Sequence, residues 1–181
     1  MNLPRTSITE ADDRRVRVTD HSVDGPVPPG RLGEIAMTVL EEEGVAIAEI
    51  SVAIVGNKEI ARLHTEFLDV EGPTDVLSFP LEGDCLSAWD GDLEARRGQG
   101  RRIDGEVVIS AEMAAEVAPR VGSTTEAEVT LYLVHGLLHL CGYDDREPSE
   151  CARMRSREAE LLGKLSVDVG QRPGDLTESG D

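Results

Sequence analysis

The amino-acid sequence predicts a single α+β domain from its length, its hydrophobic content and the order of its segments. The chain has 181 residues, enough for one domain and few for two, and 39% of them are hydrophobic, which permits an ordinary core. Short stretches with strand alternation stand between stretches with helical spacing, without the regular repeat of a β-α-β fold. We therefore expect one sheet interleaved with helices.

The first predicted helix follows a Pro-Pro-Gly turn at residues 28–30. Its apolar positions recur at helical spacing and are Leu32, Ile35, Ala36, Val39 and Leu40. Gly44 comes after them and predicts the end of the helix. Residues 1–15 are polar, and we expect them to be a disordered N-terminus before a domain that spans residues 16–163.

A strand and a helix are predicted next, followed by two further strands. Residues 50–54 alternate between large and small side chains as in a strand. Asn57 is expected to cap a helix that continues to residue 67. Short strands are predicted at residues 76–79 and 106–110.

Residues 82–104, between the last two strands, are expected to form a long surface loop inserted into the domain. Four arginines make this loop the strongly basic patch of the chain: Arg96, Arg97, Arg101 and Arg102. Two interpretations stay open, a solvated insertion and a contact surface for RNA or a partner.

Two more helices are predicted in the C-terminal half of the domain. Thr124 or Thr125 is expected to cap the first, which is the most apolar helix of the chain and ends before Gly142. The second starts at Ser149 and is ended by Gly163. Residues 164–181 hold Gly, Pro and acids with almost no apolar periodicity, so we expect a disordered tail.

Composition excludes several classes of protein. The formal net charge of −18 excludes a protein that coats nucleic acid by bulk electrostatics, so any such contact must be local. Two Phe, two Tyr and one Trp are too few for a platform on which bases stack. Three cysteines without CxxC spacing argue against a disulfide framework and a thiolate zinc site. No export signal or membrane span is recognisable, and we expect a cytoplasmic protein.

Two histidines on the most apolar helix carry the main signal for chemistry. His135 and His139 are four residues apart, so both side chains point to one side of the helix and can share a metal ion. Two core histidines are the alternative interpretation. Gly142 can reverse the chain and bring Asp145 back towards the two nitrogens, whereas a shift of one residue in the turn would bring Asp144.

Two imidazoles and one carboxylate match a zinc site with an open position for water, and manganese, iron or nickel use the same ligands. The residue after His135 is Gly136, so the helix lacks the general-base glutamate of an HExxH zinc protease. A peptidase is disfavoured, and no catalytic residue beyond the metal site is predicted.

Several segments resemble the YbeY-type metal-dependent endoribonucleases, a family of rRNA maturation factors. Residues 73–80 (PTDVLSFP) and 105–110 (GEVVIS) are similar to two strands of the family, and residues 135–145 (HGLLHLCGYDD) are similar to its HGxLHLxGYDH signature. Met154 and Glu158 are similar to its closing helix. The similarity spans roughly residues 45–163 in the family's order.

The resemblance implies a mixed, roughly four-stranded sheet packed with about five helices, with the metal site on the central apolar helix. It implies hydrolysis of phosphodiester bonds in single-stranded RNA, in the 3′-end maturation of ribosomal RNA and in ribosome quality control. The expected cofactor is one zinc ion held by His135, His139 and Asp145. The expected partners are ribosomal RNA and the small ribosomal subunit or its proteins.

The chain departs from the family's pattern at two positions. Asp145 stands where the signature has a third histidine, which lowers the charge of the site and makes a bound water less acidic. Leu68 stands where the family usually has an arginine thought to contact the RNA backbone. Lys58, Arg62, Arg146 or the loop arginines are candidates to contact phosphates in its place.

Asp75 has two interpretations, as a residue that orients a metal ligand and as a local backbone cap. Two alternative functions also stay open. One is a ribosome-assembly factor without catalysis, in which the metal is structural, and the other is a hydrolase of another phosphoester. An open coordination position favours catalysis, and a closed four-ligand site favours the assembly factor.

Overall fold

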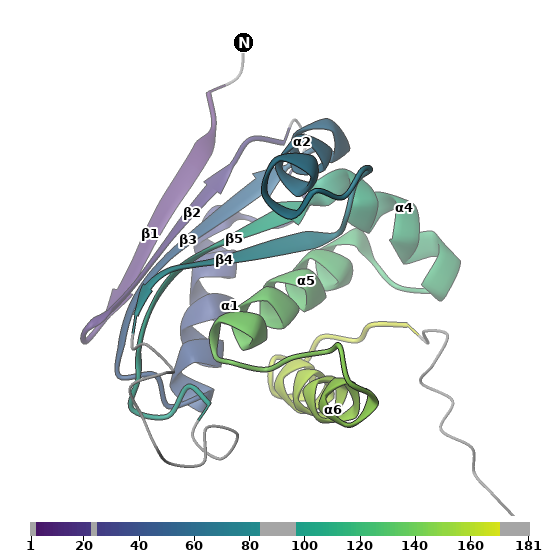
Figure 1. Ribbon diagram of the computed structural model, residues 1–181. Helices are drawn as coiled ribbons and strands as arrows, with labels where there is room; N and C mark the ends of the chain where they lie inside the picture. The colour runs from purple at the N-terminus through teal and green to yellow at the C-terminus, as the bar shows by residue number, and fades with distance from the viewer. Residues whose placement is uncertain (1–2, 23–24, 84–96, 171–181) are drawn as a thin grey trace, which may run out of the picture.

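The computed structural model describes residues 3–22, 25–83 and 97–170 of the chain. Five strands form one mixed sheet in the order β1-β2-β3-β5-β4 (Figure 1). They are β1 (Arg5–Ala11), β2 (Arg14–Asp20), β3 (Ile47–Val55), β4 (Val76–Gly83) and β5 (Arg102–Ser110). The two edge strands, β1 and β4, are antiparallel to their neighbours, and the three inner strands run parallel. The predicted α+β class is confirmed, with one strand more than the four expected.

The described ranges contain five helices, which cover the sheet in layers. They are α1 (Pro29–Glu42), α2 (Asn57–Leu68), α4 (Ala111–Val121), α5 (Thr125–Leu140) and α6 (Pro148–Lys164). Figure 1 shows α1 and α5 on one face of the sheet and α2 on the other. α5 lies between the sheet and α6, contacts α1 and α4 as well, and buries most of its side chains. Among these described helices, none is both long and apolar enough to cross a lipid bilayer.

The N-terminal residues differ from the disordered segment that was expected. β1 and β2 form an antiparallel hairpin that turns at Asp12, where φ is 53°. β2 carries Val16 and Val18 into the core, where both are fully buried. β1 is an edge strand whose side chains are mostly polar and exposed, so backbone hydrogen bonds hold it. Its sequence therefore lacks the apolar alternation from which a strand is predicted.

The segment after α6 also differs from the disordered tail that was expected. α6 ends at Lys164, and Leu165, Val167 and Val169 then pack against the core at alternate positions. The remainder of that segment, residues 171–181, lies outside the described residues, as do residues 84–96 of the expected surface loop.

Three helix termini test the expected capping residues. Gly44 has a φ of 67° just beyond α1, as predicted. The Thr124 hydroxyl accepts a backbone hydrogen bond at 3.1 Å and caps α5. The expectation for Asn57 was wrong, because Gly56 holds the capping position of α2. The Asn57 side-chain oxygen instead accepts a hydrogen bond from the Ser110 hydroxyl at 2.6 Å.

α4 is a helix that the apolar pattern did not predict. The Ser110 hydroxyl caps it by accepting a backbone hydrogen bond at 3.1 Å, and Gly122, with a φ of 72°, follows its end. Its buried positions are the alanines Ala111, Ala114 and Ala118. Because these side chains are small, they give only a weak apolar periodicity.

Close contact between α5 and the sheet depends on Gly136. A Cβ atom at this position would lie 2.6 Å from Val107 Cγ1 and 3.0 Å from Ser78 Oγ. The Ser78 hydroxyl also donates a hydrogen bond to the Gly136 carbonyl at 3.0 Å. The middle of α5 therefore lies directly on β4 and β5, and this contact fixes the position of the two histidines that flank Gly136 in the helix.

We expect Gly136→Ala to lower the free energy of unfolding by about 1–3 kcal/mol, because the added methyl group overpacks this contact. Gly163→Ala is the matched control, since a Cβ atom there meets nothing within 4 Å. That variant should gain about 0.5–1 kcal/mol from helix propensity. Urea unfolding followed by circular dichroism measures both, and equal changes in the two variants would contradict the close packing of α5.

Burial also protects Cys141, which directly follows α5. The residue is 0% exposed, and burial together with the nearby Glu43 carboxylate raises the pKa of its thiol. Little thiolate forms, and alkylating reagents have no access to it.

We expect iodoacetamide in mildly alkaline buffer to modify Cys141 only after unfolding in urea, as measured by peptide mass spectrometry. Equal rates of modification with and without urea would show instead that this helix end opens.

Candidate metal centre

Two histidines on α5 form the centre of the site. The rings of His135 and His139 meet edge to face with their centroids 4.6 Å apart, and their Nε2 atoms are 3.0 Å apart. Both side chains keep 29% exposure. The spacing thus places the two rings on one side of the helix, as predicted, and the partial exposure argues against two core histidines.

The turn after α5 brings Asp145 to this pair. Gly142 has a φ of 96°, a conformation that glycine adopts without strain, and reverses the chain there. Asp145 Oδ2 then lies 3.9 Å from His135 Nε2 and 4.0 Å from His139 Nε2. One ligand atom of each of the three residues lies within 4.8 Å of the other two.

The adjacent carboxylate, Asp144, has other partners. Its Oδ2 accepts hydrogen bonds from Arg146 Nη2 at 2.6 Å and Nε at 2.8 Å. The Arg146 side chain thereby holds the pKa of Asp144 down to about 2. The other Asp144 oxygen accepts from the Asp145 amide at 2.8 Å. Asp144 therefore stabilises the turn, and of the two carboxylates it is Asp145 that lies beside the histidines.

The second ring nitrogen of each histidine has its own partner. His135 Nδ1 lies 2.6 Å from Glu158 Oε1, and His139 Nδ1 lies 3.0 Å from the Tyr143 carbonyl oxygen. Both partners are acceptors, so we infer that each Nδ1 carries a proton and each Nε2 presents its lone pair to the site. This is the tautomer that a metal ligand needs.

Glu158 is a site residue that the signature helix does not reveal, because it comes from α6. Its side chain is only 13% exposed. Met154 and Leu161, at i−4 and i+3 from it, are both buried. A carboxylate on the buried face of an amphipathic helix needs a polar partner, and this is the sequence signal that points to a contact such as the one with His135.

The carboxylates around His135 outweigh the effect of its burial on its pKa. Burial lowers the pKa of the imidazole, but the hydrogen bond and charge of Glu158, with the charges of Asp75 and Asp145, raise it above the ordinary value. The site is therefore an anionic environment that favours a bound positive charge.

Two arginines of the expected basic loop support the turn that holds Asp145. The Arg97 guanidinium stacks 3.7 Å from the centroid of the Tyr143 ring. Arg101 is buried and donates a hydrogen bond to the Cys141 carbonyl at 3.2 Å. These two side chains therefore contact protein rather than project outward as RNA contacts.

Arg102 and Arg96 complete the expected basic loop. Arg102 pairs with Asp104 at 2.8 Å, at the start of β5. Arg96 lies outside the described residues.

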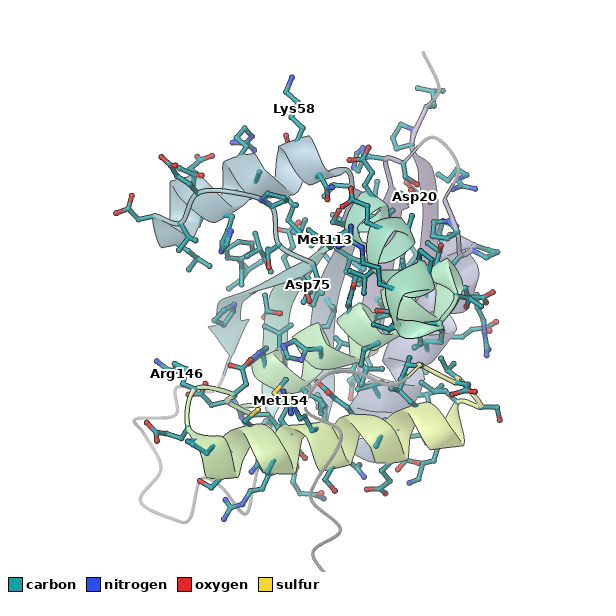
Figure 2. All side chains as sticks on the ribbon, turned by 90° about the vertical axis from the view of Figure 1, so that its right-hand side faces the viewer. Asp20, Lys58, Asp75, Met113, Arg146 and Met154 are labelled. Carbon is teal, nitrogen blue, oxygen red and sulfur yellow. The ribbon has the colours of Figure 1, made fainter. Side chains whose placement is uncertain are left out.

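The other expected RNA contacts lie in different places. Arg146 is next to the site, with a side chain that is 84% exposed (Figure 2). Lys58 points away from α5 and α6 in the same figure. Arg62 pairs with Glu59 and Glu66 along α2. Of the three, Arg146 alone adjoins a residue of the cluster, Asp145, and it is paired with Asp144. None of the three is among the residues that line the pocket.

Asp75 borders the site at the start of β4. It lines a pocket of about 590 Å³ together with His135, Asp145 and Glu158. Its Oδ1 also accepts a hydrogen bond from the Val76 amide at 2.9 Å. Asp75 therefore caps the local backbone, and its charge is also one of those that raise the pKa of His135.

The donors fit a divalent transition metal. Two imidazole nitrogens and one carboxylate oxygen converge, and each Nδ1 is held by an acceptor. Such a three-ligand set leaves coordination positions for water or substrate, and here it opens onto a pocket.

Comparison with known proteins gives one consistent result. A family model described as Endoribonuclease YbeY matches residues 19–166. A protein named Endoribonuclease YbeY from Kineococcus radiotolerans is 38% identical over 152 residues, covering 81% of each chain. One of the same name from Bacillus licheniformis is 37% identical over 154 residues, covering 83% of this chain and 94% of its own.

The fold has a counterpart among solved structures. The solution structure of a Thermotoga maritima protein aligns with a TM-score of 0.53 at 21% identity, covering 90% of this chain and 99% of its own. At this identity the likeness shows the fold alone. With the family match over most of the chain and relatives above one-third identity, the chain belongs to the Endoribonuclease YbeY family.

Proposed function

We propose that this protein is a metal-dependent endoribonuclease for single-stranded RNA, in which His135, His139 and Asp145 hold one zinc ion. The observation that carries the proposal is the convergence of these three ligand atoms within 4.8 Å of one another, on the signature segment of an endoribonuclease family. Other divalent transition metals use the same ligands and remain alternatives to zinc.

The residues around the ligands have distinct tasks in this proposal. Glu158 and the Tyr143 carbonyl hold the Nδ1 protons, which directs each Nε2 towards the ion. Asp145 supplies a negative charge, and Asp75 adds a second one at the edge of the pocket. A zinc ion held by His135, His139 and Asp145 would supply Lewis acidity, which would polarise a phosphoryl oxygen and lower the pKa of a water or ribose hydroxyl.

The substrate proposal follows from the family. The RNA is ribosomal RNA on the small ribosomal subunit, and the reactions are 3′-end maturation and ribosome quality control in the cytoplasm. Arg146, exposed beside the ligand turn, is positioned to balance a phosphate of that RNA. No membrane partner is proposed.

A ribosome-assembly factor with a structural metal is the second candidate, and the chain's net charge of −18 and Leu68 favour it. Such a factor needs a closed four-ligand site. The cluster found in the described residues has three members and opens onto a pocket, which supports catalysis over that candidate.

Metal content tests the ligand set. We expect about one equivalent of zinc in the purified protein by elemental mass spectrometry, because three convergent donors suffice for binding. Asp145→Ala should lose the metal. Asp144→Ala should keep it, since that carboxylate serves the turn, and Asp145→His should also keep it, with faster RNA cleavage from a more acidic bound water.

The double variant His135→Ala/His139→Ala provides the negative control. It should lose both the metal and the cleavage of single-stranded RNA. Metal and activity at the level of the natural protein in this variant would refute the proposal.

Glu158 gives a further test, on affinity. We expect Glu158→Gln to raise the dissociation constant for zinc by about 10-fold, the lower end of the range for loss of a carboxylate behind a ligating histidine. Glu160→Gln, on the same helix but bonded to Arg157, is the matched control and should leave it unchanged. Competition with a fluorescent chelator measures the dissociation constant of each variant. Equal constants for Glu158→Gln and Glu160→Gln would show that Glu158 does not support the metal ligand His135.

A further inference from the structure

The pocket beside the cluster extends well beyond the three ligands. Its charged and imidazole side chains are Asp75, His135, Asp145, Arg155 and Glu158, and Tyr132 and Cys151 add a hydroxyl and a thiol. Much of the remaining wall is apolar and comes from α4, α5, α6 and the segment after α6, with Val117, Val121, Leu131, Leu162 and Val169. In Figure 2, Asp75 and Met154 lie on opposite sides of the middle of α5, where the polar part of the pocket is.

The apolar part begins one helical turn away from the ligands. Leu131 precedes His135 by four residues on α5, and Leu162 follows Glu158 by four residues on α6. The segment after α6 lies against the end of α4, since a Cβ atom at Gly170 would lie 1.7 Å from the Val121 carbonyl oxygen. The apolar part is thus bounded by three helices and a chain segment.

A phosphate group does not suit this apolar part. Three carboxylates stand at its polar side, and the apolar wall offers a charged group no partner for its lost hydration. Apart from the clustered His135, Arg155 is the one basic side chain among the lining residues. A neutral, flat group that is joined to a phosphodiester suits the pocket as a whole. The phosphodiester would lie at the polar part, beside the cluster, and the neutral group would enter the apolar part.

The geometry points to a subsite for an unpaired nucleobase: we propose that the apolar part of this pocket takes the base next to the phosphodiester held at the cluster. This inference rests on the proposed function and specifies its substrate. A base in a duplex is stacked and paired, and extruding it costs a few kcal/mol, so single-stranded RNA turns a base into the pocket more readily than a duplex does. The pocket therefore provides a physical reason for selection of single strands.

Another large hollow of the described structure is also lined mainly by apolar side chains, but it lies apart from the cluster. It has a volume of about 780 Å³ and lies beneath α2, with Phe67, Phe79 and Leu81 in its lining. None of the three clustered ligands lines it. Continuity with the cluster therefore favours the first pocket for the base.

The test measures binding of a five-nucleotide RNA with 2′-O-methyl riboses to zinc-loaded protein by fluorescence anisotropy. Each of five further versions lacks one base, and gels check that the RNA stays intact. We expect at least one abasic version to bind about 10-fold more weakly, within the range for one stacked base. Val117→Trp fills the apolar part and should bind the complete RNA as weakly as that abasic version, with no further loss when the base is absent.

Two further variants keep the test interpretable. Val121→Phe fills the same part from the next turn of α4 and should repeat the result if Val117→Trp unfolds. Ile8→Trp, on the far edge strand β1, is the matched control and should bind like the natural protein. Melting temperature and zinc content are measured for all three.

The outcomes separate this inference from the proposed function. If folded, zinc-loaded Val117→Trp and Val121→Phe bind all versions like the natural protein, the base subsite is refuted while metal-dependent cleavage stands. The same conclusion follows if every abasic version binds like the complete RNA. If the zinc-loaded natural protein binds no RNA at all, the proposed function fails and the subsite with it.

Discussion

The packing of α5 against the sheet is the constraint on which the site depends. Gly136 lets the helix rest on β4 and β5, and α6 covers its other side. A helix held in this way cannot rotate without breaking the core, so His135 and His139 keep their directions. Ligands on a rigid helix are placed more accurately than ligands on a loop. The part of the site that carries the two histidines is therefore a closely packed part of the fold.

The remaining groups reach the histidines through tertiary structure. Asp145 arrives by a turn that Gly142 reverses, and the Asp144–Arg146 pair, Arg97 and Arg101 each contact that turn. Glu158 arrives from α6. Three carboxylates then surround His135 and raise its pKa despite burial. Anionic surroundings, acceptors at both Nδ1 atoms and an adjoining pocket are the features on which the proposed metal centre rests.

The sequence predicts those features that depend on local spacing. The pair His135 and His139 follows from helical periodicity, and the turn at Gly142 follows from glycine's conformational freedom. Spacing alone does not choose between Asp144 and Asp145, because the choice is made by the pairing of Asp144 with Arg146. The pattern of α6 places Glu158 on a buried face, but its contact with His135 joins two helices, and local spacing does not encode which residue it meets. The missed elements have physical reasons too: β1 is a polar edge strand, and α4 buries mainly alanines.

The most direct test of a metal centre formed by these three residues is a crystal structure of the zinc-loaded protein, with anomalous scattering recorded at the zinc edge. We predict one anomalous peak, coordinated by Nε2 of both histidines and a carboxylate oxygen of Asp145, with a water on the side of the pocket. An ion closed off by four protein ligands would contradict the catalytic role. No peak at the three residues, in crystals soaked with zinc, would contradict the metal centre itself.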